Sequence, residues 1–136
     1  MDWFAFQNGA TAFIIAFVAA VAFFVAFKFL YQLATPYNER ALIREGNVAA
    51  AVALGGALLG YVLPLASALS HTVSLPEFAA WALLAGVIQI VSFVIVSRLV
   101  YRALAARIEA GELAAGVYLA SISVGVGLLN AACMTA

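Results

Sequence analysis

Long uninterrupted runs of apolar residues dominate this chain. Four runs are long enough to cross a membrane, at residues 9–33, 47–70, 78–100 and 113–133. A bilayer crossing needs about 20 mostly apolar residues, and only helices or closed barrels satisfy their backbone polar groups in lipid. None of the runs alternates between apolar and polar residues. The pattern therefore predicts an all-α integral membrane protein with four transmembrane helices.

Helix-breaking and helix-capping residues separate the four runs. Pro36 predicts a break after the first run. Gly46 and Gly111 precede the second and fourth runs, and Ser74 begins a capping box before the third. We expect the segment 98–108 to prolong the third helix beyond the membrane.

Composition places the chain in lipid rather than water. Apolar residues make up 68% of it and charged residues 9%, whereas a soluble domain has about 45–50% and about 25%. The six basic and six acidic side chains cancel. Zero net charge without a basic tract argues against nucleic acid as a partner. The partner that composition does imply is the lipid bilayer.

All the basic residues lie near or after the ends of the first and third runs: Lys28, Arg40, Arg44, Arg98, Arg102 and Arg107. Cytoplasmic loops of membrane proteins carry an excess of lysine and arginine. We therefore expect both basic loops in the cytoplasm and both termini outside it.

The two halves of the chain resemble each other. When the sequence is shifted by 65 residues, seven of the eighteen residues 43–60 are identical to their counterparts in 108–125. Two spans return to the side where they began, so a copy has the same orientation. We therefore expect one membrane domain, 1–136, made of two parallel two-helix repeats, 1–70 and 71–136.

Small residues concentrate in the second and fourth runs. Gly56 and Gly60 form a GxxxG pair, and Ser121 and Gly125 are its counterpart in the second half. Small residues let membrane helices approach closely. We expect these four residues to pack the second and fourth helices together at the centre, with the first and third helices facing lipid more.

Two amides are polar candidates: Gln89 lies near the middle of the third run, and Asn130 lies in the last turns of the fourth. A buried amide needs a partner in hydrocarbon, so these residues form interhelical hydrogen bonds or line a polar pathway. No ionisable residue occupies the middle of a span, which argues against a proton relay.

The loops that we assign to the cytoplasm hold the densest charge. Arg40, Arg44, Arg102 and Arg107 are candidates for contact with anionic lipid headgroups or for docking a cytoplasmic protein, and Glu39 belongs to the same charged surface.

No pattern for chemistry is present. The sequence holds no nucleophile–base pair, metal cluster or phosphate loop, so we expect no catalytic residue, metal or cofactor, and no enzyme. Cys133 is the single cysteine. We expect a buried inert thiol, and pairing with a second copy is the alternative.

Two blocks carry a resemblance to a known family, Gly60-Tyr61-Val62-Leu63-Pro64-Leu65 and the ending Asn130 to Thr135. With weaker matches along nearly the whole chain, they resemble the YjfL-like family of small bacterial inner-membrane proteins. The resemblance implies four spans made of two copies of a two-helix domain and an inner-membrane location. It implies no reaction, and it suggests an association with proteins of the envelope-stress response.

Two functional hypotheses follow. The first is a non-enzymatic homo-oligomeric scaffold or anchor for a cytoplasmic partner, linked to envelope stress. The second is a small oligomeric channel or transporter whose pathway includes Gln89 and Asn130.

Overall fold

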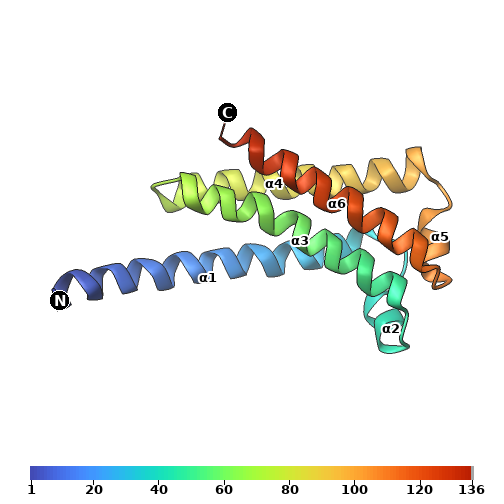
Figure 1. Ribbon diagram of the computed structural model, residues 1–136, viewed down its shortest axis with the longest axis horizontal. Helices are drawn as coiled ribbons and strands as arrows, with labels where there is room; N and C mark the ends of the chain where they lie inside the picture. The colour runs from blue at the N-terminus through green and yellow to red at the C-terminus, as the bar shows by residue number, and fades with distance from the viewer. Residues whose placement is uncertain (136) are drawn as a thin grey trace.

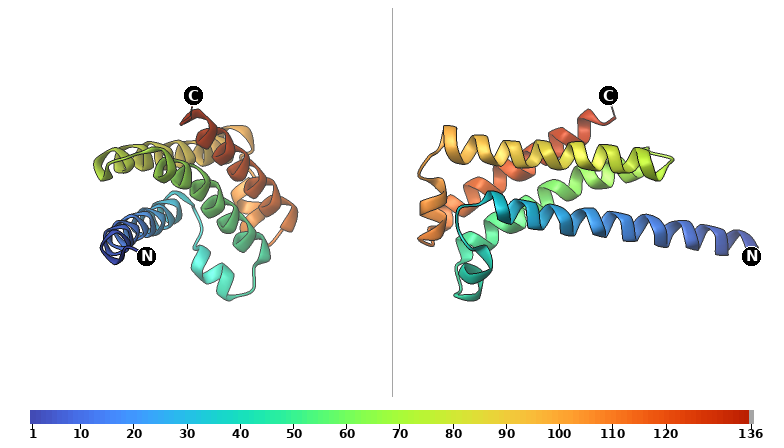
Figure 2. Two further views of the ribbon diagram at one scale, coloured as in Figure 1. Left: turned by 60° about the vertical axis from the view of Figure 1, so that its left-hand side comes forward. Right: turned by 180° about the vertical axis from the view of Figure 1, so that it is seen from behind.

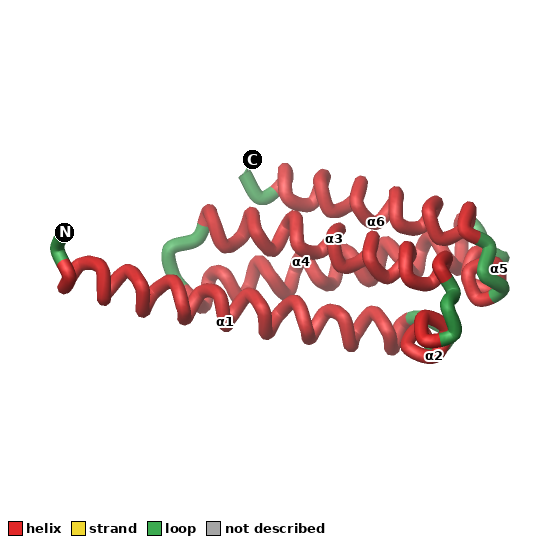
Figure 3. Tube along the Cα trace, turned by 60° about the horizontal axis from the view of Figure 1, so that its bottom comes forward, coloured by secondary structure: helices red, strands yellow, loops and turns green. Residues whose placement is uncertain are grey.

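A computed structural model describes residues 1–135 of the chain. The elements in chain order are α1 (Trp3–Ala34), α2 (Glu39–Arg44), α3 (Val48–His71), α4 (Leu75–Ile95), the π-helical turn η1 (Val96–Val100), α5 (Leu104–Glu109) and α6 (Leu113–Cys133). Helices α1, α3, α4 with η1, and α6 are long and apolar enough to cross a membrane. The described residues contain no strand (Figure 3). The prediction of an all-α protein with four spans is confirmed.

Side-chain caps begin α2, α3 and α4, and the starts of α3 and α4 are those that the sequence predicts. The Oδ1 atoms of Asn38 and Asn47 accept hydrogen bonds from the backbone N–H of Ala41 (3.1 Å) and Ala50 (3.0 Å). The Ser74 hydroxyl accepts one from the Glu77 N–H at 3.3 Å. Each cap satisfies a backbone donor that the first helical turn leaves free. Local sequence therefore sets these boundaries.

Two boundaries differ from the prediction. Helix α1 begins at Trp3, six residues before the predicted run, because the Asp2 carboxylate caps the N–H groups of Phe4 and Ala5. The third span does not continue through 98–108. The backbone of Tyr101 leaves the helical region, with φ −139° and ψ 87°, and the chain then turns into the separate helix α5.

Helices α3 and α6 cross at the centre of the molecule, with α4 and α1 on their flanks (Figures 1 and 2). The most apolar 18-residue window is 56% buried in α3 but 6% buried in α1. The N-terminal part of α1 extends beyond the other helices (Figure 1). The first and third spans are less buried than the second and fourth, as predicted, although α4 (28%) differs little from α6 (33%). Helix α4 contributes Ala82, Ala85 and Gln89 to the core.

The two halves have the same order of elements after their first spans. Helices α2 and α5 both have six residues and start 65 positions apart. Gly46 and Gly111 follow them with the same φ of +87°, a left-handed conformation that glycine adopts without strain. These parallels agree with a duplication, which stays a prediction.

One end of the molecule holds all the basic residues. Helices α2 and α5 lie at this end, and both chain termini lie away from it (Figure 1). We call it the basic end. If the positive-inside rule holds for this protein, the basic end faces the cytoplasm.

Candidate functional site

The contact between α3 and α6 depends on small residues. A Cβ atom built on Gly56 would overlap Ala120, and one built on Gly60 would overlap the carbonyl group of Ser123. A Cβ on Gly127 would overlap the Gly60 carbonyl in turn. The backbones of the two helices therefore touch directly, which maximises van der Waals contact in the absence of a hydrophobic drive between membrane helices.

Ser121 and Gly125 do not take part in this contact, contrary to the prediction. A Cβ on Gly125 would meet nothing within 4 Å, and the exposed Ser121 hydroxyl donates to the carbonyl of Val117 in its own helix. The face of α6 that meets α3 instead carries residues at the spacing of one helical stripe: Gly116, Ala120, Ser123 and Gly127. Gly125 lies two residues from Gly127 and so points away, because each residue turns a helix by about 100°.

Gln89 and Asn130 meet at the centre of the bundle. Asn130 Nδ2 donates to Gln89 Oε1 at 3.3 Å and to the carbonyl of Ala85 at 3.2 Å. Gln89 Nε2 donates to the carbonyl of Ser123 at 3.2 Å. The residues are 5% and 8% exposed. The two amides therefore bind each other and the backbones of α4 and α6, which is the interhelical alternative of the sequence analysis.

Pro64 shapes the same region. Proline has no N–H, so the carbonyl of Gly60 loses its usual helical donor. Gly127 lies against this carbonyl. The free carbonyl is covered by α6 and does not open into a polar passage.

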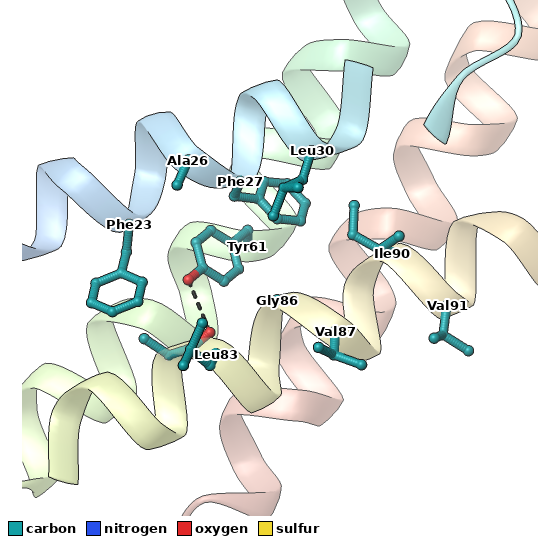
Figure 4. A pocket seen from close by; sticks show the side chains of 11 residues that line it. Phe23, Ala26, Phe27, Leu30, Tyr61, Leu83, Gly86, Val87, Ile90 and Val91 are labelled. Carbon is teal, nitrogen blue, oxygen red and sulfur yellow. Dashed lines mark hydrogen bonds between the residues drawn. The ribbon is translucent and has the colours of Figure 1, made fainter. Parts of the chain in front are cut away.

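An apolar groove of about 330 Å³ lies between α1, α3 and α4 (Figure 4). Tyr61 lies in it, stacks on Phe27 with 4.3 Å between ring centroids, and donates its hydroxyl hydrogen to the carbonyl of Ala82 at 2.9 Å. Gly86 leaves room for the Tyr61 ring. With its one polar side chain already bonded, the groove suits hydrocarbon rather than a polar substrate.

A buried carboxyl group lies at the basic end, which corrects the prediction that Glu39 belongs to the charged surface. Glu39 is 2% exposed, and neither of its carboxyl oxygens has a hydrogen-bond partner among the described residues. The hydroxyls of Tyr31 and Tyr37 are also buried without a partner. Burial raises the pKa of Glu39 from its ordinary value of 4.5 to about 7. Burial, together with the Glu39 charge, raises the pKa of Tyr37.

The four predicted arginines are all at the basic end but differ in their contacts. Arg40, Arg44 and Arg102 are exposed. Arg107 forms an ion pair with Glu112 and donates to the Tyr101 hydroxyl. The Arg107–Glu112 pair is the single ion pair within residues 1–135. Three arginines therefore remain free for an external partner.

Cys133 is exposed, which corrects the expectation of a buried thiol. It ends α6 on the side that faces away from the bundle. Among the described residues no group of histidine, cysteine, aspartate and glutamate side chains could hold a metal ion.

Sequence reasoning missed two features of the site. The stripe on α6 was readable, because residues at i, i+4, i+7 and i+11 share a helix face. The burial of Glu39 had a weaker signal, the two tyrosines that precede it around a helix break.

Comparison with known proteins finds relatives over nearly the whole chain. The family described as Domain of Unknown Function (DUF350) matches residues 5–134. The UPF0719 inner membrane protein YjfL of Escherichia coli (strain K12) is 44% identical over 124 residues, which are 91% of this chain and 93% of the relative. The UPF0719 transmembrane protein YshE of Bacillus subtilis (strain 168) is 32% identical over 114 residues, 83% of this chain and 85% of the relative. No solved structure matches the chain.

Proposed function

Because the chain belongs to the DUF350 family of membrane proteins, as its resemblance to YjfL-like proteins predicted, we propose that it acts as a non-enzymatic membrane scaffold. In this proposal the four helices anchor the protein in the inner membrane and form homo-oligomers. The basic end then docks a cytoplasmic protein. A link to envelope stress rests on the family resemblance.

The closed centre of the bundle carries the proposal. The side chains of Gln89 and Asn130 form hydrogen bonds with each other and with the backbones of neighbouring helices. The α3–α6 contact leaves no room for even one added methyl group at Gly56, Gly60 or Gly127. A transport pathway needs polar groups that face a water-filled space. This packing therefore favours a scaffold over a channel.

The free arginines support docking. Arg40 and Arg44 lie on α2, and Arg102 lies in the turn before α5. All three are exposed, and none has an acidic side chain within ion-pair distance among the described residues. Arginine binds carboxylates through two parallel hydrogen bonds. The partner that fits this surface is a cytoplasmic protein with an acidic face.

Helix α1 supports oligomerisation. It has 32 residues, of which Phe27 and Tyr31 are buried, and its N-terminal part extends beyond the bundle (Figure 3). Its exposed side chains include Phe13 and Phe17, whose rings stack with 6.1 Å between centroids. Such a face can pack on α1 of a second copy.

The docking proposal is tested by charge reversal. Arg40, Arg44 and Arg102 are changed together to Glu, and Arg107 is kept because its ion pair with Glu112 is internal. We expect the purified protein to capture a cytoplasmic protein and the triple variant to lose at least about tenfold of that capture, because three charge-assisted contacts are lost. The matched control changes Gln7 and Asn8 to Glu, which adds negative charge at exposed positions of α1 away from the basic end. Equal capture by the triple variant would count against docking.

Ion flux tests the alternative hypothesis. A scaffold reconstituted in liposomes gives no flux above that of empty vesicles. Flux that falls in Gln89→Leu and Asn130→Leu would replace the scaffold with a channel. Single-molecule photobleaching in the same liposomes counts the subunits.

A further inference from the structure

A cavity of about 370 Å³ lies where α1 ends and α2 begins. Its lining residues are chemically of four kinds. Glu39 and Tyr37 line it and carry oxygen atoms that are buried, and Arg40 contributes a guanidinium group. The remaining lining residues are two amides and two apolar side chains: Gln32, Asn38, Phe29 and Leu33. The volume lies at the lower end of the range for small-molecule pockets, about 300–1,000 Å³.

The Glu39 carboxyl group is the most unusual feature of the cavity, because it is buried without a hydrogen-bond donor from the described residues. It is 2% exposed, and both of its oxygens lack a hydrogen-bond donor among the described residues. The side chains of Thr35, Gln32 and Lys28 lie close enough to favour its ionised form, but none of them donates a hydrogen bond of normal geometry to it. Lys28 and Arg40 both lie beyond ion-pair distance. A carboxylate buried without a partner is strongly destabilising, and the carboxyl group avoids this either by taking up a proton or by binding a cation. A positive group with several N–H donors would satisfy both of its oxygens.

The other walls narrow the ligand further. Arg40 is exposed on the same cavity and forms no ion pair with a described residue, so it is available to an anion such as phosphate. Phe29 and Leu33 are 51% and 83% exposed on the membrane-spanning helix α1, where acyl chains surround them. A ligand that fits these residues therefore contains an ammonium group, a phosphate group and a hydrocarbon chain.

We propose that this cavity binds the headgroup of phosphatidylethanolamine, with the ammonium group at Glu39 and the phosphate at Arg40. A primary ammonium carries three N–H donors, enough for both carboxylate oxygens and the Tyr37 hydroxyl. Phosphatidylcholine has the same charges but no N–H donor. Phosphatidylglycerol has no cation for Glu39.

The experiment compares defined bilayers. The purified full-length chain is placed in nanodiscs of phosphatidylcholine alone, or with equal fractions of added phosphatidylethanolamine or phosphatidylglycerol. Of the two added lipids, we expect only phosphatidylethanolamine to raise the melting temperature of the protein, by about 5 °C. We also expect native mass spectrometry to show about tenfold preferential retention of this lipid. Because no partner protein is present, the result does not depend on the proposed scaffold function.

Matched variants locate the site. Glu39→Gln and Arg40→Gln both remove the preference for phosphatidylethanolamine, whereas Glu45→Gln, at an exposed glutamate that caps the end of α2, keeps it. Arg40 is exposed, so its variant tests the site even where Glu39→Gln fails to fold.

Three results would overturn the proposal. One is equal stabilisation by phosphatidylcholine or phosphatidylglycerol. Another is an unchanged lipid preference in Glu39→Gln and Arg40→Gln. The third is a fall in melting temperature in Lys28→Gln that equals the fall in Glu39→Gln and does not depend on the lipid. Lys28 would then be the partner of the carboxylate.

Discussion

At the scale of single residues, this protein combines satisfied and unsatisfied buried polar groups. Gln89 and Asn130 find partners in each other and in the backbone. Glu39 finds none among the described residues. Buried polar groups are nearly always hydrogen-bonded in proteins. The exception at Glu39 therefore marks a place where something outside the chain is expected to bind.

The first prediction concerns pH. The pKa of Glu39 is raised from 4.5 in the ordinary case to about 7 in the folded chain, so the unfolded chain releases this proton at lower pH than the folded chain does. The free energy of unfolding is then highest below about pH 4.5 and falls as the pH rises to about 7, by about 3 kcal/mol. Reversible unfolding in mixed micelles without phosphatidylethanolamine measures this slope.

The control isolates the Glu39 carboxyl group. Thr35, Gln32 and Lys28 act on this carboxyl group, and Tyr37 lies near it. Glu39→Gln should remove the slope between pH 4.5 and 7. A slope that persists in this variant would assign the effect to another group.

The second prediction concerns the central amides. Gln89→Leu and Asn130→Leu should each lower the free energy of unfolding by about 1 kcal/mol, because membrane interhelical hydrogen bonds average about 0.6 kcal/mol and each variant breaks more than one. The double variant should lose less than the sum, since the two side chains share a bond. Gln7→Leu, at an exposed glutamine on α1, serves as the control. Strict additivity would show that the amides act separately.

At the scale of helices, the register of α6 against α3 decides which small residues matter. Gly127 and Gly125 lie two positions apart on one helix, yet a Cβ would overlap α3 at the first and meet open space at the second. Gly56 and Gly55 form the same contrast on α3. Adjacent glycines in one apolar run therefore have opposite roles.

The third prediction uses this contrast. Gly56→Ala and Gly127→Ala should destabilise the protein by about 1–3 kcal/mol, because the backbone contact is overpacked. Gly55→Ala and Gly125→Ala should be neutral or stabilise it by about 0.5–1 kcal/mol, because alanine favours the helix. Unfolding in mixed micelles compares the four variants. Loss of oligomer in Gly125→Leu alone would place that glycine at a contact between copies.

At the scale of the whole molecule, the basic loops and the chain termini lie at different ends of the bundle. Helices α2 and α5 lie at one end and carry Arg40, Arg44 and Arg107, with Arg102 in the turn before α5. Both termini lie away from that end (Figure 1). This arrangement is what a protein inserted by the positive-inside rule requires. It makes the orientation in the membrane testable with a single natural thiol.

The fourth prediction concerns that orientation. The exposed Cys133 should react with a membrane-impermeant maleimide added to spheroplasts. Arg44→Cys in a Cys133→Ser background should react only after the membrane is permeabilised, because α2 then faces the cytoplasm. The reverse labelling pattern would invert the topology and move the docking surface out of the cytoplasm.

The sequence by itself determined the number of spans, most of their boundaries and the grouping of the basic residues. These properties follow from hydropathy, capping side chains and the order of residues along the chain, all of which are local. Gly46 and Gly111, for example, precede α3 and α6 as predicted. Only the tertiary structure decided that Gly127 rather than Gly125 meets α3, that Gln89 meets Asn130, and that Glu39 is buried. Each of these outcomes depends on the rotation and crossing of helices, which is set by packing between residues far apart in the chain.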